Sequence, residues 1–442
     1  MLKKIFLLFP SCLLCLFISN ADASKIYQYK LNNGLKLLIK VDKRAPVVIS
    51  QIWYKIGSCD EYLGITGISH VLEHMMFQGS KNYPPGSIAK IIAENGGKQN
   101  AATSEDYTYY YQELPSDKLA LSFAIEADRM QNLNIAAENF IKELAVVKEE
   151  RRLRTDNNPQ AVTLERFMAT ANIATAYHNP VVGWMQDLNQ LTDNDVKTWY
   201  QKYYAPNNAI LIIVGNVQPK KVYQLAQKYF SNIKPKIIPR KENSYDTEAL
   251  GKRTVNTHIK AELPFLILGF NVPSLKTLSK KNKWQAYALE LIAVILAGGN
   301  SNRFNENLVK NAKIASYIDA DYNLYSKFTT TFNIYAVNYP GRTTVDLENA
   351  ILKELDNLKK EKISQNELEK AKIILRAENV FQQDYLSAQA TTLGQVTSVD
   401  LPAETAEKFL INIEKITATQ IQKMAQEFFI ENRLTIATLE PK

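Results

Sequence analysis

One segment of the chain occurs twice, and this repeat constrains the fold more than any other feature. The segment LTDNDVKTWYQKYYAPNNAILIIVG begins at Leu191, and ITATQIQKMAQEFFIENRLTIATLE begins at Ile416. The two align without a gap at a constant spacing of 225 positions, so that Thr192 falls on Thr417. Each copy starts with a threonine suited to cap a helix, continues through an amphipathic stretch to an aromatic pair, and enters an apolar strand after a turn. The spacing is far longer than that of solenoid repeats, so two copies of one α+β unit are predicted.

The repeat divides the 442-residue chain into two homologous domains. Each is expected to be an α/β sandwich in which a mixed or antiparallel sheet is covered by helices, so the predicted fold class is α+β. YQYKLNNGLKLLIKV predicts a hairpin early in the first domain, and FLILGFNV predicts an early strand of the second. The predicted boundaries are a signal peptide over 1–23, a first domain over 24–235, a proline-containing, charged linker over 236–253 and a second domain over 254–442.

The amino-terminal residues are typical of an export signal. Lysines at positions 3 and 4 precede the apolar run IFLLFPSCLLCLFI, and Ala-Asp-Ala at 21–23 supplies the small-x-small pattern that signal peptidase cleaves. The run is shorter than the roughly 20 residues that a membrane-spanning helix needs, and a proline interrupts it. We therefore expect export to the periplasm or the exterior, with a mature chain that begins at Ser24 and has no membrane span.

Composition and charge narrow the classes of function. Hydrophobic residues make up 46% of the chain and charged residues 22%, as in a folded protein. The net charge of +8 comes from scattered Lys and Arg without a basic block interleaved with aromatics, which argues against nucleic-acid binding. Once the signal is removed, Cys59 is the single cysteine, so no internal disulfide is expected in the mature fold.

Two of the four histidines lie within five residues, His70-Val71-Leu72-Glu73-His74. If this segment is helical, His70, Glu73 and His74 share one face, because they are separated by three and four positions. This spacing suits two imidazoles that bind one Zn²⁺, with a carboxylate beside them to act on water. The order H-x-x-E-H is also that of the inverted zinc-peptidase motif. The alternatives are two neighbouring core or surface histidines, or a structural zinc site, although structural sites usually use four Cys or His ligands.

A catalytic zinc needs a third protein ligand and one open position. The candidates in this sequence are His178, His258 or a carboxylate. Glu143 and Glu150 in IKELAVVKEERRLR are seven positions apart, two helical turns on the same face. Taken alone, glutamates in such a segment are more often exposed to solvent than bound to a metal.

The motifs around this cluster resemble those of the M16 metallopeptidases, a family that includes pitrilysin, insulin-degrading enzyme and the mitochondrial processing peptidase. The resemblance covers nearly the whole mature chain and is greatest to bacterial members with two homologous domains. The segments that carry it are TGISHVLEHMMFQGS, YPPG, ENGGKQNAATSEDYT, EADRM, VVKEERRLRTDNNP and GWMQDLNQLT.

The resemblance implies a complete zinc site in the first domain, with one Zn²⁺ per chain. His70 and His74 would be ligands, and Glu150, which lies 76 positions after His74, would be the third. Glu73 would be the catalytic base, and Glu143 would be an accessory glutamate that helps the site without binding the metal. Such an enzyme hydrolyses oligopeptides or unfolded segments with zinc-activated water.

The resemblance also implies how the peptide substrate is held. In the family the substrate lies extended and adds to the edge of a sheet near the metal. The segment NAATSEDYTYYYQEL occupies the position of that edge strand, which makes Asn100, Ala101 and Thr103 candidate substrate contacts. A run rich in Thr and Tyr is also what an ordinary strand contains.

The second domain lacks the metal motif, because the repeat spacing carries His70 into LELIAVILAGGNSN, which has no histidine. Family members place an Arg and a Tyr, seven positions apart, on this domain to bind the substrate carbonyl. The nearest match here is Lys310 with Tyr317, which makes these two residues possible substrate contacts in this chain, and Val309 stands at the arginine position in the simplest alignment. The Arg fork binds an oxygen with a fixed geometry that Lys does not reproduce. We therefore expect a homologous M16 partner subunit, in a heterodimer or a homodimer, to supply the pair. The alternative is a non-catalytic M16-like subunit for substrate binding or assembly.

Overall fold

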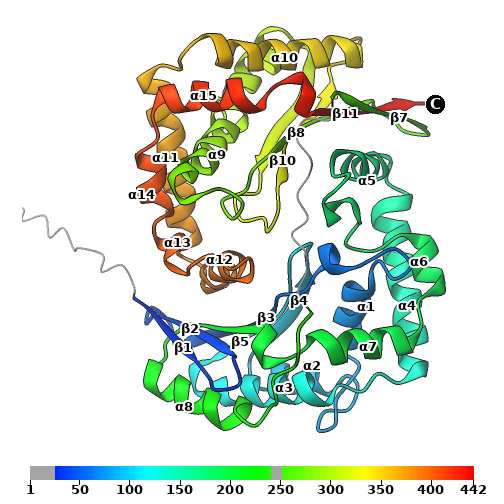
Figure 1. Cartoon of the computed structure of the whole chain (residues 1–442), viewed down its shortest axis with the longest axis vertical. Helices are drawn as coiled ribbons and strands as arrows, with labels where there is room; N and C mark the ends of the chain where they lie inside the picture. Colours follow the sequence, from blue (N-terminus) through cyan, green and yellow to red (C-terminus); the bar gives the residue numbers. More distant parts are fainter. Residues whose placement is uncertain (1–24, 240–250) are drawn as a thin grey trace, which may run out of the picture.

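The computed structural model describes residues 25–239 and 251–442, so the predicted signal peptide and most of the predicted linker lie outside the described residues. The described chain forms two halves stacked along its longest axis, and each half contains one sheet with its own helices (Figure 1). This arrangement confirms the predicted α+β fold with two related units. None of the helices in the described ranges is long and apolar enough to cross a membrane.

The first half contains a six-stranded mixed sheet in the order β1-β2-β6-β3-β5-β4. β2 and β6 are parallel, and the other neighbours are antiparallel. The predicted hairpin is confirmed, because Ile26 pairs with Lys40 and Lys30 with Lys36. β4 ends the sheet and has β5 as its one partner among the described strands. The strands are β1 (Ile26–Lys30), β2 (Lys36–Val41), β3 (Val47–Tyr54), β4 (Lys98–Thr103), β5 (Thr108–Pro115) and β6 (Ala209–Gly215).

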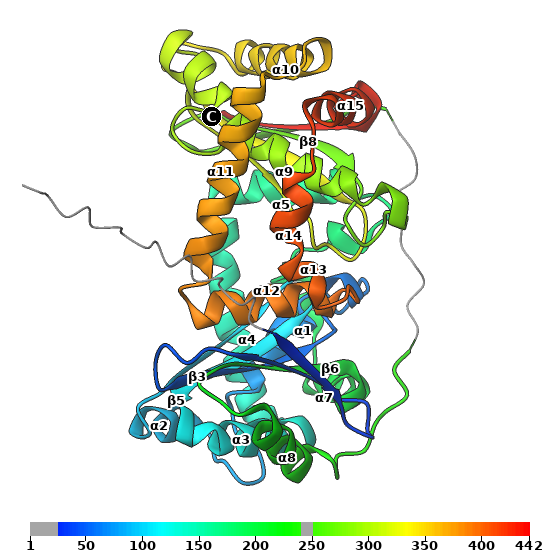
Figure 2. The same cartoon turned by 90° about the vertical axis from the view of Figure 1, so that its left-hand side faces the viewer.

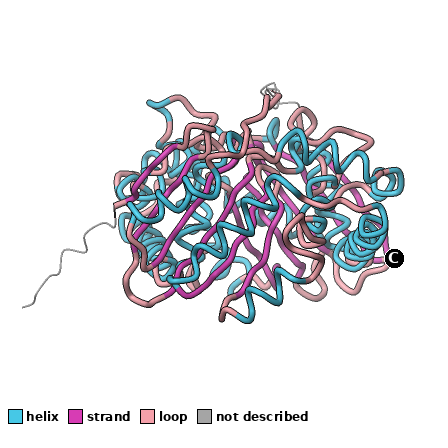
Figure 3. The backbone as a smooth tube through the Cα atoms, turned by 90° about the horizontal axis from the view of Figure 1, so that it is seen from below, coloured by secondary structure: helices cyan, strands magenta, loops and turns pink. Residues whose placement is uncertain are grey.

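Helices cover one face of this sheet, where they lie across the strands when the molecule is viewed from below (Figure 3). Alternate residues of the strands point to that face, so Leu37, Ile52 and Leu211 meet Phe123 and Phe230 in a fully buried core. The helices in this part of the chain are α1 (Ile68–Met75), α2 (Ser87–Glu94), α3 (Leu119–Asn132), α4 (Ala137–Arg151), α5 (Pro159–Ala171), α6 (Met185–Gln190), α7 (Asp193–Tyr203) and α8 (Pro219–Phe230).

The second half repeats this plan with five strands in the order β7-β11-β8-β10-β9. β7 and β11 are parallel, as β2 and β6 are, so β9 takes the place of β4 at the end of the sheet. β7 begins at Arg253, the last residue of the predicted linker. The elements are β7 (Arg253–Ile259), β8 (Phe265–Val272), α9 (Trp284–Ala297), β9 (Ala315–Tyr322), β10 (Thr330–Asn338), α10 (Thr344–Lys360), α11 (Gln365–Gln382), α12 (Leu386–Ser398), α13 (Glu404–Glu407), α14 (Phe409–Glu414), α15 (Ala418–Phe428) and β11 (Leu434–Pro441).

The two halves exchange one helix each across the other face of their sheets. α12 lies on the first sheet against β3 and β6, and α5 lies on the second sheet against β7 and β11 (Figure 2). Both contacts place an aromatic ring against a glycine. A Cβ added at Gly394 would lie 2.0 Å from the ring of Trp53, and one at Gly269 would lie 2.2 Å from Phe167. The exchange therefore requires a residue without a side chain at both positions.

Candidate metal centre

The predicted helix at the histidine motif is confirmed as α1. It begins after Gly67, whose positive φ of 86° favours glycine. The carboxylate of Glu61 accepts hydrogen bonds from the backbone N–H groups of Gly67 (2.7 Å) and Ser69 (2.8 Å), so it satisfies donors that the first turn leaves open. Burial raises the pKa of Glu61 to about 8, against the lowering effect of these two hydrogen bonds. The buried carboxyl group of Glu61 thus caps the start of α1.

α4 packs beside α1 and turns two glutamates toward the histidines. Leu72 of α1 and Val147 of α4 are fully buried in the shared core. Because positions 143, 147 and 150 follow the helical period, Glu143 and Glu150 lie on the face that meets α1. Glu149 points away, with 57% of its side chain exposed, and pairs with Arg152 at 3.0 Å. The structure therefore brings Glu150, rather than Glu149, to the motif.

His70, His74 and Glu150 each offer one donor atom, and these atoms lie within 4.8 Å of one another. The Nε2 atoms of His70 and His74 are 3.8 and 3.5 Å from Oε2 of Glu150. Ligands at zinc distances of about 2.0–2.1 Å in a tetrahedron are separated by about 3.3 Å, so the three donors fit one Zn²⁺ after small adjustments. Burial lowers the pKa of His70 to about 3, which leaves its imidazole neutral, as a metal ligand must be.

Glu143 contacts His74 but is not itself one of the three residues of the donor cluster. Its carboxylate lies 3.0 Å from Nδ1 of His74 and accepts a hydrogen bond of 2.7 Å from Nε2 of Gln78. A proton on Nδ1 of His74 leaves Nε2 of that ring free to face the cluster. Glu143 thus has the geometry of a residue that orients His74.

Glu73 lies between the histidines and the edge strand. The hydroxyl of Thr103, the last residue of β4, donates a hydrogen bond to its carboxylate. Burial raises the pKa of Glu73, and the charge of Glu150 adds to this, while the Thr103 hydrogen bond opposes it. A carboxyl group whose pKa is shifted toward neutrality can both accept and return a proton.

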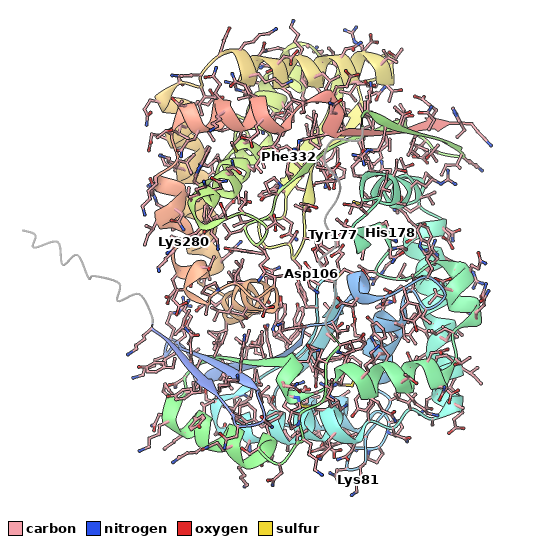
Figure 4. The ribbon with its side chains drawn as sticks, in the orientation of Figure 1. Lys81, Asp106, Tyr177, His178, Lys280 and Phe332 are labelled. Carbon is pink, nitrogen blue, oxygen red and sulfur yellow. The ribbon has the colours of Figure 1, made fainter. Side chains whose placement is uncertain are left out.

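A cavity of about 660 Å³ opens above these residues. His178, a candidate third ligand, lines the cavity but is outside the donor cluster, and Figure 4 shows it beside Tyr177 between the two halves. His258, the other candidate, lies in β7 of the second sheet. The cavity is lined by all three donors, by Glu73, by the predicted contacts Asn100, Ala101 and Thr103, and by Arg154, Leu164 and Met168 among others.

Two residues predicted to act on the substrate are absent from this lining. Lys310 is exposed and pairs with Glu306 at 2.7 Å. Tyr317 lies on β9, is 53% exposed, and donates a hydrogen bond to Asp319 at 3.3 Å. The structure does not bring this pair to the cavity around the histidines.

Sequence reasoning missed several cavity residues. Leu164 and Met168 come from α5, whose own amphipathic pattern does not indicate which sheet it covers. Arg154 follows α4 and pairs with Glu150 at 2.6 Å, although 79% of its side chain is exposed. Its place four positions after Glu150 is the one clue, because residues at that spacing are neighbours on a helix.

Comparison with known proteins identifies the family of this chain. Residues 36–183 match the family description Insulinase (Peptidase family M16), and residues 190–375 match Peptidase M16 inactive domain. The chain is 32% identical over 422 residues to Zinc protease PqqE of Helicobacter pylori, with 93% of this chain and 92% of that protein covered. The chain therefore belongs to the M16 peptidase family, and the name of that relative supports a peptidase role.

Solved structures show the same fold. The crystal structure of a protease from Helicobacter pylori matches with a TM-score of 0.89 and 30% identity, over 95% of this chain and all of that chain (100%). The periplasmic protease PqqL from Escherichia coli matches with a TM-score of 0.79 over 95% of this chain, but this covers 48% of that chain. At 18% identity the second likeness shows the fold alone.

Proposed function

We propose that this chain is the zinc-binding subunit of an exported endopeptidase that hydrolyses oligopeptides or unfolded segments. The observation that carries the proposal is the cluster of His70, His74 and Glu150, with Glu73 beside it and the free edge of β4 alongside in the same cavity. A zinc ion held there would supply Lewis-acid chemistry, because it lowers the pKa of water and polarises a carbonyl group.

The chain's own residues then have separate tasks. Glu73 would accept the proton of the attacking water and donate it to the nitrogen of the leaving amine. Thr103 would hold the Glu73 carboxylate through the hydrogen bond from its hydroxyl. Glu143 would fix the ring of His74 by accepting from Nδ1.

The outer edge of β4, which has no strand partner among the described residues, would bind the substrate. An extended peptide can pair its backbone with an unpaired strand edge, so affinity would come from the main chain and side-chain preference would be loose. Asn100 and Ala101 lie on this strand and line the cavity. The substrate would thus run past Glu73 as an additional strand of the first sheet.

A homologous partner and export are also part of the proposal. Lys310 and Tyr317 stay apart from the cavity, and Lys does not reproduce the rigid two-point donor geometry of Arg. The match to about half of the Escherichia coli protease supports the view that two such units act together. Export is supported by the signal-like residues 1–23.

The test compares the mature chain with its Glu73→Gln variant. Both should carry one zinc, and only the unsubstituted chain, together with a homologous partner, should cleave an internally quenched peptide. Glu149→Gln is the matched control, because Glu149 points to solvent on the same helix as Glu150. Zinc binding without hydrolysis even with the partner would instead favour the non-catalytic M16-like subunit. Hydrolysis by the chain alone would rule out the need for a partner.

A further inference from the structure

The loop between β9 and β10, residues 323–329, reaches from the second half of the molecule to the wall of the metal-site cavity. The backbone N–H groups of Lys327 and Phe328 donate to the hydroxyl of Tyr177, at 2.9 and 3.2 Å, and Tyr177 lines that cavity. The rings of Tyr177 and Phe328 lie 5.7 Å apart between centroids, and both residues are buried. Figure 4 shows Tyr177 between the two halves, near Asp106.

Asp106 lies at the centre of this contact, in the turn that joins β4 to β5. Its carboxylate accepts hydrogen bonds from the hydroxyl of Tyr177 (2.8 Å to each oxygen) and from the backbone N–H of Lys327 (3.0 Å). Burial raises the pKa of Asp106 to about 6, against the lowering effect of these hydrogen bonds, so the group is ionised at neutral pH. A buried carboxylate that loses a donor keeps an unsatisfied charge, so this contact depends on donors from both halves.

The side chain of Lys327 makes a further contact with the first half. Its Nζ lies 3.1 Å from Oδ1 of Asp60, whose side chain is fully buried. The other carboxylate oxygen of Asp60 accepts from the backbone N–H of Gly57 at 2.9 Å. The residue after Asp60 is Glu61, which caps α1. Lys327 thus ties the second half to the segment that leads into the helix of the histidine motif.

Residues 57–60 pack directly against the turn at the end of β4. The backbone N–H of Ser58 donates to the carbonyl oxygen of Ser104 at 3.2 Å. A Cβ added at Gly57 would lie 2.3 Å from the same oxygen, so a side chain does not fit between the two segments. Because Ser104 directly follows Thr103, a displacement of residues 57–60 or of the turn would be passed to the last residue of β4.

We propose that Lys327 is a positioning residue through which the second half of the molecule holds the end of β4 against the metal centre. The contacts lead from Lys327 through Asp106 and residues 57–60 to Thr103, whose hydroxyl donates to Glu73. The inference rests on the proposed peptidase function, because Thr103 would hold Glu73 in place during hydrolysis. It gives the unit without the metal motif a task of its own, which is to fix the geometry of a site in the other unit.

The first measurement is amide hydrogen exchange on the full mature chain at neutral pH, read by mass spectrometry. In Lys327→Met and in Tyr177→Phe, peptides that span residues 98–108 should exchange about tenfold faster or more, because the turn opens more often. Peptides from β11, inside the second sheet, should exchange as in the unsubstituted chain.

The matched control is Lys55→Met. Lys55 pairs with Asp400 of the second half at 2.5 Å, so this variant also removes an ion pair between the halves. The side chains of Lys55 and Lys327 are equally exposed, at 27%, and neither Lys55 nor Asp400 lines the cavity. Exchange over residues 98–108 should therefore stay unchanged in Lys55→Met.

The second measurement separates positioning from general stability. With the homologous partner present and one zinc per chain, Lys327→Met should lower kcat about tenfold, but less than about twofold in a chain that already carries Thr103→Val, since both changes act on one contact. Lys327→Arg should recover most of the loss, because it keeps a positive charge for Asp60. Lys55→Met should leave kcat within about twofold in both backgrounds.

Each outcome supports or overturns the positioning role. Exchange over residues 98–108 that is unchanged in both variants, or that rises equally in Lys55→Met, overturns it. A loss of kcat that is as large with Thr103→Val as without it also overturns it, because Lys327 would then act on the stability of the fold alone. Faster exchange confined to residues 98–108 supports it even in a chain that hydrolyses nothing, so a failure of the peptidase function is recognised separately.

Discussion

Replacing Glu143 with alanine should weaken zinc binding without removing a ligand. The structure gives the carboxylate two contacts, one with Nδ1 of His74 at 3.0 Å and one from Gln78 at 2.7 Å. Loss of a hydrogen bond to a charged group costs about 1.5–3 kcal/mol, and loss of an outer partner of a metal-binding histidine typically costs about 10–100-fold in affinity. The two estimates agree, because a loss of 1.4 kcal/mol in binding free energy corresponds to about a tenfold loss of affinity.

Zinc affinity would be measured by competition with a chromophoric chelator at fixed pH. Glu143→Gln should fall between the unsubstituted chain and Glu143→Ala, because an amide oxygen can still accept from Nδ1 of His74 but carries no charge. Glu149→Ala is the control, since that side chain is exposed and paired with Arg152. An affinity for Glu143→Ala within about twofold of the unsubstituted chain would refute the orienting role of Glu143.

Three further predictions follow from the packing and the charges. Gly394→Ala should lower the free energy of unfolding in urea by about 1–3 kcal/mol, because its Cβ would overlap the Trp53 ring, whereas Ser387→Ala on the same helix should not. Burial raises the pKa of Glu290 from 4.5 to about 8, so the folded state favours its protonated form. The resulting contribution to the free energy of unfolding is complete below pH 4.5 and is lost as the pH rises through 8. In denaturant titrations at several pH values, the Glu290→Gln variant should not show this fall in the free energy of unfolding. A variant with the same pH profile as the unsubstituted chain would contradict the prediction. Thr103→Val should slow hydrolysis while zinc content stays at one per chain, and equal rates would show that its hydroxyl does not hold Glu73.

The parts of the site that depend on local spacing were predictable from the sequence. His70, Glu73 and His74 lie on one helix face because their separations match the helical period. The third ligand was predicted through a family resemblance, because residue types alone left His178, His258 and a carboxylate open. Residues far apart in the sequence can be neighbours in space. The contact between α1 and α4 depends on buried apolar residues such as Leu72 and Val147, and nothing in the sequence indicates that these residues pack against each other.

The helix exchange could not be predicted from amphipathic patterns. The apolar face of α5 includes Leu164, Phe167 and Met168, and the same face would suit either sheet. A weak signal was available in FLILGFNV, because glycine inside a strand indicates close approach of another group. That group is Phe167, which packs against Gly269. The sequence can therefore indicate that another group approaches Gly269 closely, but it does not show that this group is Phe167.

The duplication explains why the two halves differ in chemistry while sharing a framework. Each unit presents one carboxyl group on the helix after its central strand and one on the helix beside it, as Glu73 and Glu150 do in the first unit. Two imidazoles added to this arrangement complete a zinc cluster. Without them, Glu290 and Glu378 of the second unit are not part of any set of three donor atoms among the described residues. Substitutions at Glu290 should therefore leave the zinc content unchanged.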